Sequence, residues 1–297
     1  MSLQNIDLNK NFQLGVLGYP LSHTLSPIIH NYWMQKYQIK GSYNSLEIQT
    51  NDLTTFFKDN ISKFKGLNVT IPHKINVFEF MDEIDNSAKV IGAINCISIN
   101  NEGKLVGANT DAAGFMSGLR KFIPEIGFDN SNIMIIGAGG ASRAVIYSLL
   151  LESVKKISIS NRSRDRLKVI GRDFNGVLNP VDWDQKSKEI SNADIIINCT
   201  SLGMLGNDSL DIDVSSFNEN AIVIDLVYNP IETELIKSAK KRGHRVLNGL
   251  PMLLHQAALS WKIWFDILPD IDNEPVIWCA SVISSPNIVE PVANAID

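Results

Sequence analysis

The chain has 297 residues, which is enough for one large domain or for two domains of ordinary size. Its 44% hydrophobic and 20% charged residues are typical of a soluble globular protein. The formal net charge of −5, without a clustered basic stripe, disfavours binding to nucleic acid or to anionic lipid, so we expect neither as a partner.

The first third of the chain alternates strand and helix patterns. We predict strands over 13–18, 42–48 and 67–71, helices over 27–38, 51–62 and 75–85, and a strand pair (94–100 and 104–109) around the turn 101–103. Such alternation is typical of an α/β domain with a mainly parallel sheet.

Lys74 stands in an unusual place within this pattern. Pro72 suits the first position of the third helix, because its missing N–H would be unpaired there anyway. Lys74 then falls in the first turn, where a cation is disfavoured by roughly 0.3–1 kcal/mol. A solvated lysine is the simplest interpretation, and we expect the adjoining His73 to be solvated too. If Lys74 has a partner, Asp111 is the best candidate, although on its own Asp111 would be taken for a helix cap.

The second half continues with a helix over 111–123, a turn-rich segment, and a strand, glycine turn and helix over 132–151. Further strands are predicted over 155–161, 193–201 and 221–229, which together make residues 113–247 a doubly wound α/β unit of Rossmann type. The long amphipathic pattern over 248–268 predicts a helix that crosses back to the first domain. We expect the tail, 284–297, to be loosely ordered.

The glycine turn GAGGAS (137–142) follows a buried strand and opens a helix, which is the context of a dinucleotide-binding motif. Gly137 permits the tight turn, and Gly139 lets the backbone approach a pyrophosphate held at the helix N-terminus. Ser142 replaces the third glycine, so the match is imperfect, and a tight turn without a ligand is the alternative.

The end of the next strand, SNRSRDR (160–166), lacks the acidic residue that usually binds the ribose of NAD. A guanidinium such as that of Arg162 can grip a 2′-phosphate and stack on adenine, and Arg166 lies one helical turn further on. We therefore predict NADP(H) as the cofactor. Two alternatives remain: Asp165 could pair with these arginines, or they could be solvated residues at a helix start.

The three cysteines, Cys96, Cys199 and Cys279, are far apart and show neither CxxC nor Cys/His spacing. We predict reduced thiols in a cytoplasmic protein and no metal site. The N-terminal segment is polar and lacks a signal core, and no apolar run reaches the ~18 residues of a membrane span.

The chain resembles the shikimate dehydrogenase family over nearly its whole length. Nine segments match in order and spacing: SHTLSP (22–27), GLNVTIPHK (66–74), GAIN (92–95), GANTDAAGF (107–115), GAGGASR (137–143), NRS (161–163), NCTSLGM (198–204), DLVYNP (225–230) and GLPMLLHQAA (249–258). The resemblance implies reversible, NADPH-dependent reduction of 3-dehydroshikimate to shikimate in aromatic amino-acid (chorismate) biosynthesis. It also implies two α/β domains that flank a cleft: a substrate domain, 1–112 with 248–297, and the Rossmann domain, 113–247.

The resemblance assigns roles by position. Lys74 and Asp111 match the family's catalytic pair, and we expect a charged Lys74 to exchange the proton while Asp111 positions it. The positions that hold the substrate match Thr24, Ser26, Thr70, Asn95, Asp111, Tyr228 and Gln256. The cofactor positions match Gly137, Ala138, Gly139, Gly140, Ala141, Asn161, Arg162, Ser163, Arg166, Thr200, Leu226, Gly249 and Met252, with Met252 near the nicotinamide.

Thr24 stands at a position where the family usually has serine. Threonine keeps the hydroxyl group and adds a methyl group. A quinate/shikimate dehydrogenase of broader substrate or cofactor use is therefore the nearest alternative. A non-catalytic sensor on the same fold and a dehydrogenase for folate or amino acids are more distant ones, because both Lys74 and Asp111 are present. The oligomeric state stays open between monomer and homodimer.

Overall fold

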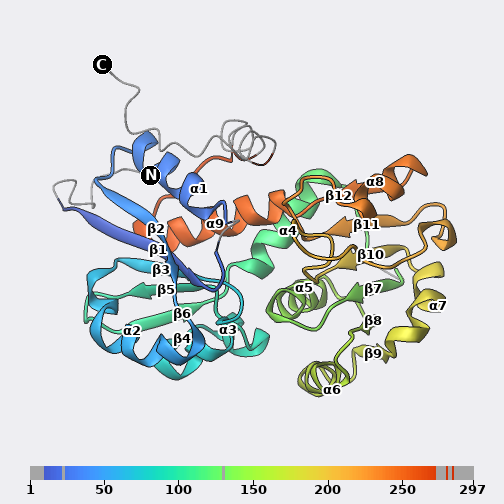
Figure 1. Cartoon of the computed structure of the whole chain (residues 1–297), viewed down its shortest axis with the longest axis horizontal. Helices are drawn as coiled ribbons and strands as arrows, with labels where there is room; N and C mark the ends of the chain where they lie inside the picture. The colour runs from blue at the N-terminus through green and yellow to red at the C-terminus, as the bar shows by residue number, and fades with distance from the viewer. Residues whose placement is uncertain (1–9, 22–23, 129–130, 272–278, 280–282, 284–297) are drawn as a thin grey trace.

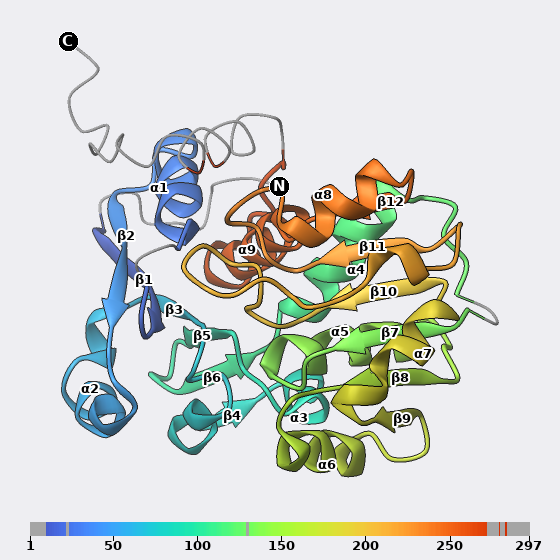
Figure 2. The same ribbon diagram turned by 45° about the vertical axis from the view of Figure 1, so that its right-hand side comes forward.

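Two six-stranded sheets organise the part of the chain that the computed structural model describes, residues 10–21, 24–128, 131–271, 279 and 283. The first sheet takes its strands from residues 12–108 and the second from residues 133–247. Figure 1 shows them on opposite sides of the molecule, with α4 and α9 running between, and Figure 2 shows the second sheet turned forward with helices on its faces. The predicted architecture of two α/β units is therefore confirmed.

The first sheet has the strand order β2–β1–β3–β5–β6–β4 and is mixed but mainly parallel. Parallel pairing joins β1 to β2, β1 to β3 and β4 to β6, whereas β3–β5 and β5–β6 are antiparallel. The last pair is the hairpin predicted around residues 101–103. The strand bounds are β1 (Phe12–Gly18), β2 (Gly41–Glu47), β3 (Gly66–Val69), β4 (Glu83–Ile84), β5 (Cys96–Ile99) and β6 (Leu105–Ala108).

Three α-helices accompany this sheet: α1 (Ser26–Lys36), α2 (Leu53–Asp59) and α3 (Asn86–Ile91). Pro27 lies in the first turn of α1, as the sequence predicts. The prediction of an α-helix over 75–85 is wrong. A turn over 71–75 leads into a short 3-10 helix (Asn76–Phe80), and the chain then joins the sheet as β4, where the N–H groups of Asp82 and Asp85 bond to carbonyls of β6. Pairing with the sheet edge satisfies backbone groups that a helix would otherwise have satisfied.

The second sheet is parallel throughout, in the order β12–β11–β10–β7–β8–β9. Counted from β7, this is the order of a Rossmann fold, whose ligands bind where the strand order reverses, here between β7 and β10. Its strands are β7 (Ile133–Ile136), β8 (Ile157–Ser160), β9 (Leu178–Val181), β10 (Ile195–Asn198), β11 (Ile222–Asp225) and β12 (Arg245–Leu247). Its helices are α5 (Gly140–Leu151), α6 (Arg164–Asp173), α7 (Lys186–Ser191) and α8 (Glu234–Lys241).

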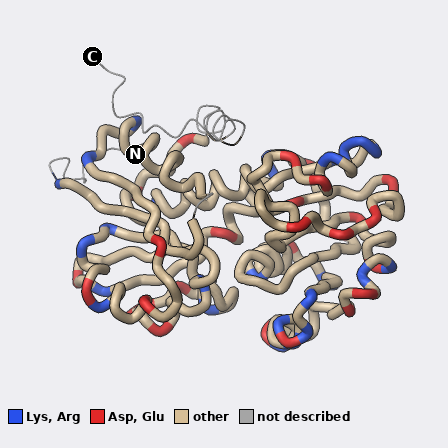
Figure 3. Tube along the Cα trace, viewed as in Figure 1, with Lys and Arg blue, Asp and Glu red and all other residues tan. Residues whose placement is uncertain are grey.

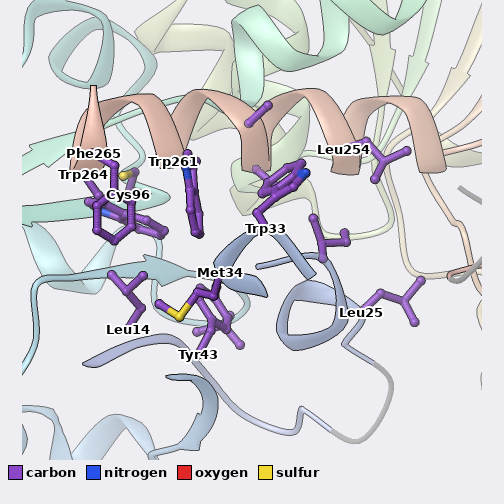
Figure 4. Packing of buried hydrophobic residues seen from close by; sticks show 14 of the residues in the cluster. Leu14, Leu25, Trp33, Met34, Tyr43, Cys96, Leu254, Trp261, Trp264 and Phe265 are labelled. Atoms are coloured by element: carbon purple, nitrogen blue, oxygen red, sulfur yellow. The ribbon is translucent and has the colours of Figure 1, made fainter. Parts of the chain in front are cut away.

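Helices α4 (Asp111–Phe122) and α9 (Leu250–Phe265) link the two halves by packing against each other. They approach closely because α4 carries Gly114, where a Cβ atom would lie 2.7 Å from the backbone nitrogen of Gln256. At its far end α9 packs on the first sheet, where the Trp264 Nε1 donates to the Ile97 carbonyl at 3.0 Å. Figure 4 shows Trp261 and Trp264 pointing from α9 toward Trp33 and Tyr43, an aromatic core between α9, α1 and β2.

Acidic and basic residues are interspersed along both halves of the molecule (Figure 3). Lys240 and Lys241 in the last turn of α8 suit the partial negative charge of a helix C-terminus. Among the described residues, no helix combines the length and the apolar character needed to cross a membrane.

Candidate active site

A cleft of about 780 Å³ opens between the two sheets, walled mainly by segments that follow strand ends. Seventeen of the residues that the family resemblance assigns to the site line it: Thr24, Ser26, Thr70, Lys74, Asn95, Asp111, Ala138, Gly139, Gly140, Ala141, Arg166, Thr200, Leu226, Tyr228, Gly249, Met252 and Gln256. Gly137, Asn161, Arg162 and Ser163 are not part of its wall. The fold thus gathers residues from eight of the nine matched segments into one space.

Lys74 and Asp111 form an ion pair inside this cleft, with 2.5 Å between Lys74 Nζ and Asp111 Oδ2. The lysine side chain is 16% exposed and the aspartate side chain 5%. Lys74 sits in the turn after β3, not in a helical turn, and its carbonyl accepts a hydrogen bond from the Ile94 N–H at 2.8 Å. The expected conflict with a helix N-terminus therefore does not arise, and the lysine is paired, not solvated.

Asp111 is the first residue of α4, yet its carboxylate does not cap the helix. Asn109 Oδ1 instead accepts the Asp111 N–H at 3.0 Å, while Asn109 Nδ2 donates to the Ala93 carbonyl at 2.8 Å. The cap interpretation of Asp111 is therefore wrong, and its carboxylate is free to face Lys74.

Asn95 fixes the second carboxylate oxygen. Its Nδ2 lies 2.8 Å from Asp111 Oδ1, and it is also within 2.9 Å of Thr110 Oγ1 and 3.2 Å of Gln256 Oε1. Its Oδ1 accepts the Thr110 N–H at 2.7 Å. Because one oxygen of Asp111 faces an amide and the other an ammonium group, the carboxylate is held in one orientation.

Asn68 belongs to this network although the sequence analysis did not single it out. Its Nδ2 donates to the Asn95 carbonyl at 3.1 Å and to Ser260 Oγ at 2.9 Å, and its Oδ1 accepts the Tyr43 hydroxyl at 2.8 Å. Burial raises the pKa of Tyr43 well above its usual value, so the phenol stays a neutral donor. The available signal was a polar residue between Leu67 and Val69 in an otherwise apolar strand.

The rim near α1 offers further hydroxyl groups. Thr24 Oγ1 accepts the Ser26 N–H at 3.4 Å, and both residues line the cleft. Tyr228 faces them from the second sheet, and burial raises its pKa to about 12. The phenol is therefore a neutral hydrogen-bonding group at physiological pH.

The glycine turn forms the opposite wall. Gly137 has φ +112°, a conformation that side chains with a Cβ rarely adopt, and it leads from β7 into α5. A Cβ atom on Gly139 would meet nothing within 4 Å, whereas one on Gly140 would lie 3.3 Å from Lys74 Cδ. The turn therefore leaves room at Gly139 for a ligand to approach the backbone, directly beside the catalytic candidates.

The polar residues after β8 have different tasks. Asn161 Oδ1 accepts the Ala138 N–H of the glycine turn at 3.1 Å, and Ser163 Oγ caps α6 by accepting the Arg166 N–H at 3.4 Å. Within the described residues, Arg162 and Arg166 have no acidic partner, and Asp165 makes no ion pair with either of them. Two guanidinium groups are thus available to an anion.

Arg143 is a second cleft residue that the sequence analysis left unassigned. It extends from α5 to the first half of the molecule, where its Nε donates to the Ile91 carbonyl at the end of α3. Its Nη2 pairs at 2.8 Å with Asp173, the last residue of α6. It joins the two halves of the molecule beside the cleft.

His73, expected to be solvated, is buried instead, with Nε2 donating to the Ile48 carbonyl at 2.7 Å.

Comparison with known proteins identifies the family and supports the fold. Sequence models described as "Shikimate dehydrogenase substrate binding domain", "Shikimate / quinate 5-dehydrogenase" and "Shikimate 5'-dehydrogenase C-terminal domain" match residues 16–97, 120–239 and 249–273. The shikimate dehydrogenase (NADP(+)) of Ruegeria sp. (strain TM1040) is 37% identical over 260 residues, which cover 87% of this chain and 94% of the relative. The chain belongs to the shikimate dehydrogenase family.

Solved structures of the family support the same conclusion. The shikimate dehydrogenase of Aquifex aeolicus is 33% identical, with a TM-score of 0.81 over 94% of this chain and 99% of the other. The Thermus thermophilus enzyme, solved in complex with NADP(H) and shikimate, is 30% identical, with a TM-score of 0.80 over 92% of this chain and 99% of the other. The family resemblance drawn from the nine segments is therefore confirmed.

Proposed function

We propose that the protein catalyses the reversible, NADPH-dependent reduction of 3-dehydroshikimate to shikimate, a step of aromatic amino-acid biosynthesis. The observation that carries the proposal is the Lys74–Asp111 ion pair, which faces a dinucleotide-type glycine turn across one cleft. An acid–base pair beside a dinucleotide site is what carbonyl reduction requires. The relative from Ruegeria sp., named as an NADP(+)-dependent shikimate dehydrogenase, supports this choice of reaction.

Lys74 is proposed as the group that exchanges the proton. A charged ammonium group can donate a proton to the carbonyl oxygen as that oxygen gains charge, and in the oxidation direction the lysine must first lose a proton. The short contact to Asp111, itself fixed by Asn95, aims the lysine at one position in the cleft. Asp111 would thereby position Lys74.

The substrate would be held by hydroxyl and amide groups on the cleft wall: Thr24, Ser26, Thr70, Asn95, Tyr228 and Gln256. Such groups can donate to and accept from an array of ring hydroxyls. Analogues that lack a hydroxyl would leave buried polar groups unpaired and are expected to bind poorly.

The second sheet is suited to a dinucleotide. The α5 N-terminus attracts anions, and the open space at Gly139 lets a pyrophosphate reach the backbone of residues 137–141. Arg162 and Arg166 would bind the 2′-phosphate, beside Asn161 and Ser163. Thr200, Leu226, Gly249 and Met252 would line the remaining wall toward the nicotinamide. When bound, NADPH supplies the hydride.

We further propose that residues 1–112 with 248–297 form the substrate domain and residues 113–247 the cofactor domain. A cytoplasmic location fits the three cysteines, which are all free. The protein is proposed to work as a monomer or a homodimer on small-molecule substrates alone.

The test is an NADPH oxidation assay with 3-dehydroshikimate, run beside the reverse assay with shikimate or quinate and either NADP⁺ or NAD⁺. We expect kcat/KM to be highest for 3-dehydroshikimate with NADPH and for shikimate with NADP⁺. Quinate oxidation at a kcat/KM similar to that for shikimate would favour a quinate/shikimate dehydrogenase of broader specificity, the alternative that Thr24 suggests. No turnover with any of these substrates would refute the proposal.

A further inference from the structure

Asp225 is a buried carboxylate that the proposed chemistry does not use. It ends β11, its residue has no exposed surface, and it is not part of the cleft wall. The register of the second sheet places it directly opposite Asn198, the last residue of β10. Two polar side chains therefore face each other at the edge where the ligands of a Rossmann fold bind.

Three hydrogen-bond donors converge on this carboxylate. Asp225 Oδ1 accepts from Asn198 Nδ2 at 2.9 Å and from the Val227 N–H at 3.1 Å, and Oδ2 accepts from the Thr233 hydroxyl at 2.7 Å. The Thr233 oxygen in turn accepts the Ile236 N–H at 3.2 Å, as the cap of α8. Because every contact directs a donor at Asp225, the cluster matches an ionised carboxylate.

Asn198 extends the cluster into the loop after β10. Its Nδ2 also donates to the Leu202 carbonyl at 3.1 Å, and its Oδ1 accepts both the N–H and the hydroxyl of Thr200, at 3.0 and 2.7 Å. Thr200 and Met204 of this loop line the cleft. The amide of Asn198 thus couples the shape of this loop to Asp225.

The loop after β11 and the start of α9 depend on the same carboxylate. Asp225 binds the Val227 N–H, and the Val227 carbonyl accepts the Gly249 N–H at 3.1 Å. Leu226 and Tyr228 flank Val227 in the cleft wall, and Gly249 is the N-cap of the helix that carries Met252. Three wall segments, following β10, following β11 and opening α9, are therefore tied to one buried group.

We propose that Asp225 is a positioning residue for the reaction: with Asn198 and Thr233 it sets the relative placement of the three wall segments that meet cofactor and substrate. This inference rests on the proposed function and deepens it. It gives Asn198 of the segment NCTSLGM and Asp225 of the segment DLVYNP a task in the same site, although neither residue lines the cleft. A misplacement of about 1 Å at such a wall can cost roughly 100-fold in rate.

Asp194 provides a matched control at the opposite edge of the same sheet. It precedes β10, its Oδ2 accepts the Asn132 N–H at 2.8 Å, and its Oδ1 accepts from Asn218 Nδ2 at 3.2 Å. Like Asp225 it fixes loops through its carboxylate, but none of these three residues lines the cleft. Asp225 is fully buried and Asp194 only half-buried, so the comparison depends on Kd and KM instead of on equal stability losses. A purely structural role for Asp225 would lower the melting temperature and leave Kd and KM unchanged.

The experiment compares Asp225→Ala, Asp225→Asn and Asp194→Ala by three measurements: the Kd for NADPH from fluorescence titration, KM and kcat, and the melting temperature. Asp225→Ala is expected to raise the Kd for NADPH and the KM for shikimate by about 10- to 100-fold. Asp225→Asn should recover most of the affinity, because its oxygen can still accept from Asn198 and Val227 while its amide donates to Thr233. Asp194→Ala should lower the melting temperature and leave Kd and KM within about twofold of the wild type, as expected for a site apart from the cleft.

Two results would overturn the inference: an unchanged NADPH Kd in Asp225→Ala, or an equal loss of affinity in Asp194→Ala. If Asp225→Ala does not fold, Thr233→Val decides, because it removes one donor and keeps the side-chain volume. An NADPH Kd unchanged in Thr233→Val would then refute the inference. NADPH binding can be measured without turnover. A wild-type protein that binds NADPH but does not reduce 3-dehydroshikimate would refute the proposed function, and the NADPH Kd values of the variants could still be compared.

Discussion

Replacing Lys74 by methionine removes the ammonium group and keeps a side chain of similar length in the cleft. A general acid typically contributes 10²–10⁴ in rate, so kcat should fall by about that factor, equivalent to roughly 3–5 kcal/mol of barrier at about 1.36 kcal/mol per decade. The KM for shikimate should change far less, because the wall hydroxyl and amide groups remain.

The structure also sets the cost in stability. Asp111, with a side chain only 5% exposed, would lose the ammonium partner at 2.5 Å and keep the Asn95 amide at 2.8 Å. Breaking a buried pair from one side costs about 3–5 kcal/mol, and the 16% exposure of the lysine favours the lower end. The double variant Lys74→Met/Asp111→Asn removes the orphaned charge and should regain stability without regaining rate.

Steady-state NADPH absorbance measures kcat and KM when each substrate is varied in turn at a saturating concentration of the other. Urea unfolding measures the free energy of unfolding. Lys104→Met is the matched control, because Lys104 also makes ion pairs, with Glu83 and Glu102, but is exposed and apart from the cleft. A Lys74→Met enzyme with kcat within tenfold of the wild type would refute the role of Lys74. So would a double variant that regains the lost rate.

Three further predictions test other parts of the molecule. Arg166→Gln should raise the KM for NADPH about 10- to 100-fold and leave the KM for NADH nearly unchanged, because it removes a charge-assisted contact to the 2′-phosphate; an equal effect on both cofactors would contradict this. Burial lowers the pKa of His30 from 6.5 to about 3, so the folded protein resists a proton that the unfolded chain accepts, and stability is lost as pH falls below 6.5. Urea unfolding at pH 7 and pH 4 should show this loss as about 3 kcal/mol that is absent in His30→Phe; equal acid sensitivity in both proteins would exclude His30 as its source. Gly249→Ala should lower the melting temperature, because a Cβ atom there would lie 2.0 Å from the Leu226 carbonyl oxygen. Gly139→Ala should keep the melting temperature, because its Cβ atom points into open space, and it should weaken NADPH binding, because that space is where the pyrophosphate would bind. Thermal melts with and without NADPH check this pair, and the reverse pattern would contradict it.

Most of the strands, and the helices α1, α2, α4, α5 and α9, were predictable because their signals are local, whereas β4, β9, β12, α3, α7 and α8 were not predicted. The buried runs of β7 and β10, Pro27 at the start of α1, and the glycine turn before α5 each report the backbone conformation of the residues that carry them. The helix prediction for the segment 75–85 was wrong because the deciding contact is not local. Its apolar spacing suits a helix, but β6 offers hydrogen bonds to its second half, and no local pattern reports a distant sheet edge.

The cofactor site was partly readable in the same way. The glycine turn and the arginines after β8 lie on consecutive elements, and the rules of the Rossmann fold bring them to one edge of the sheet. Asn161 and Ser163 show the limit of that approach. They stand in the right motif, yet the motif does not specify the Asn161 bond to the Ala138 N–H, which spans 23 residues, or the local Ser163 cap of α6.

By itself the sequence determined the two α/β units, the position of the dinucleotide turn and the family, because these depend on periodicity, on glycine conformation and on ordered motifs. Only the tertiary structure decided that Lys74 is paired instead of solvated, since 37 residues separate it from Asp111. The same holds for the buried His73 and for the convergence of Asn68 and Asn95 behind the carboxylate. Hydrogen bonds of this kind depend on distances across elements, which spacing along the chain does not specify.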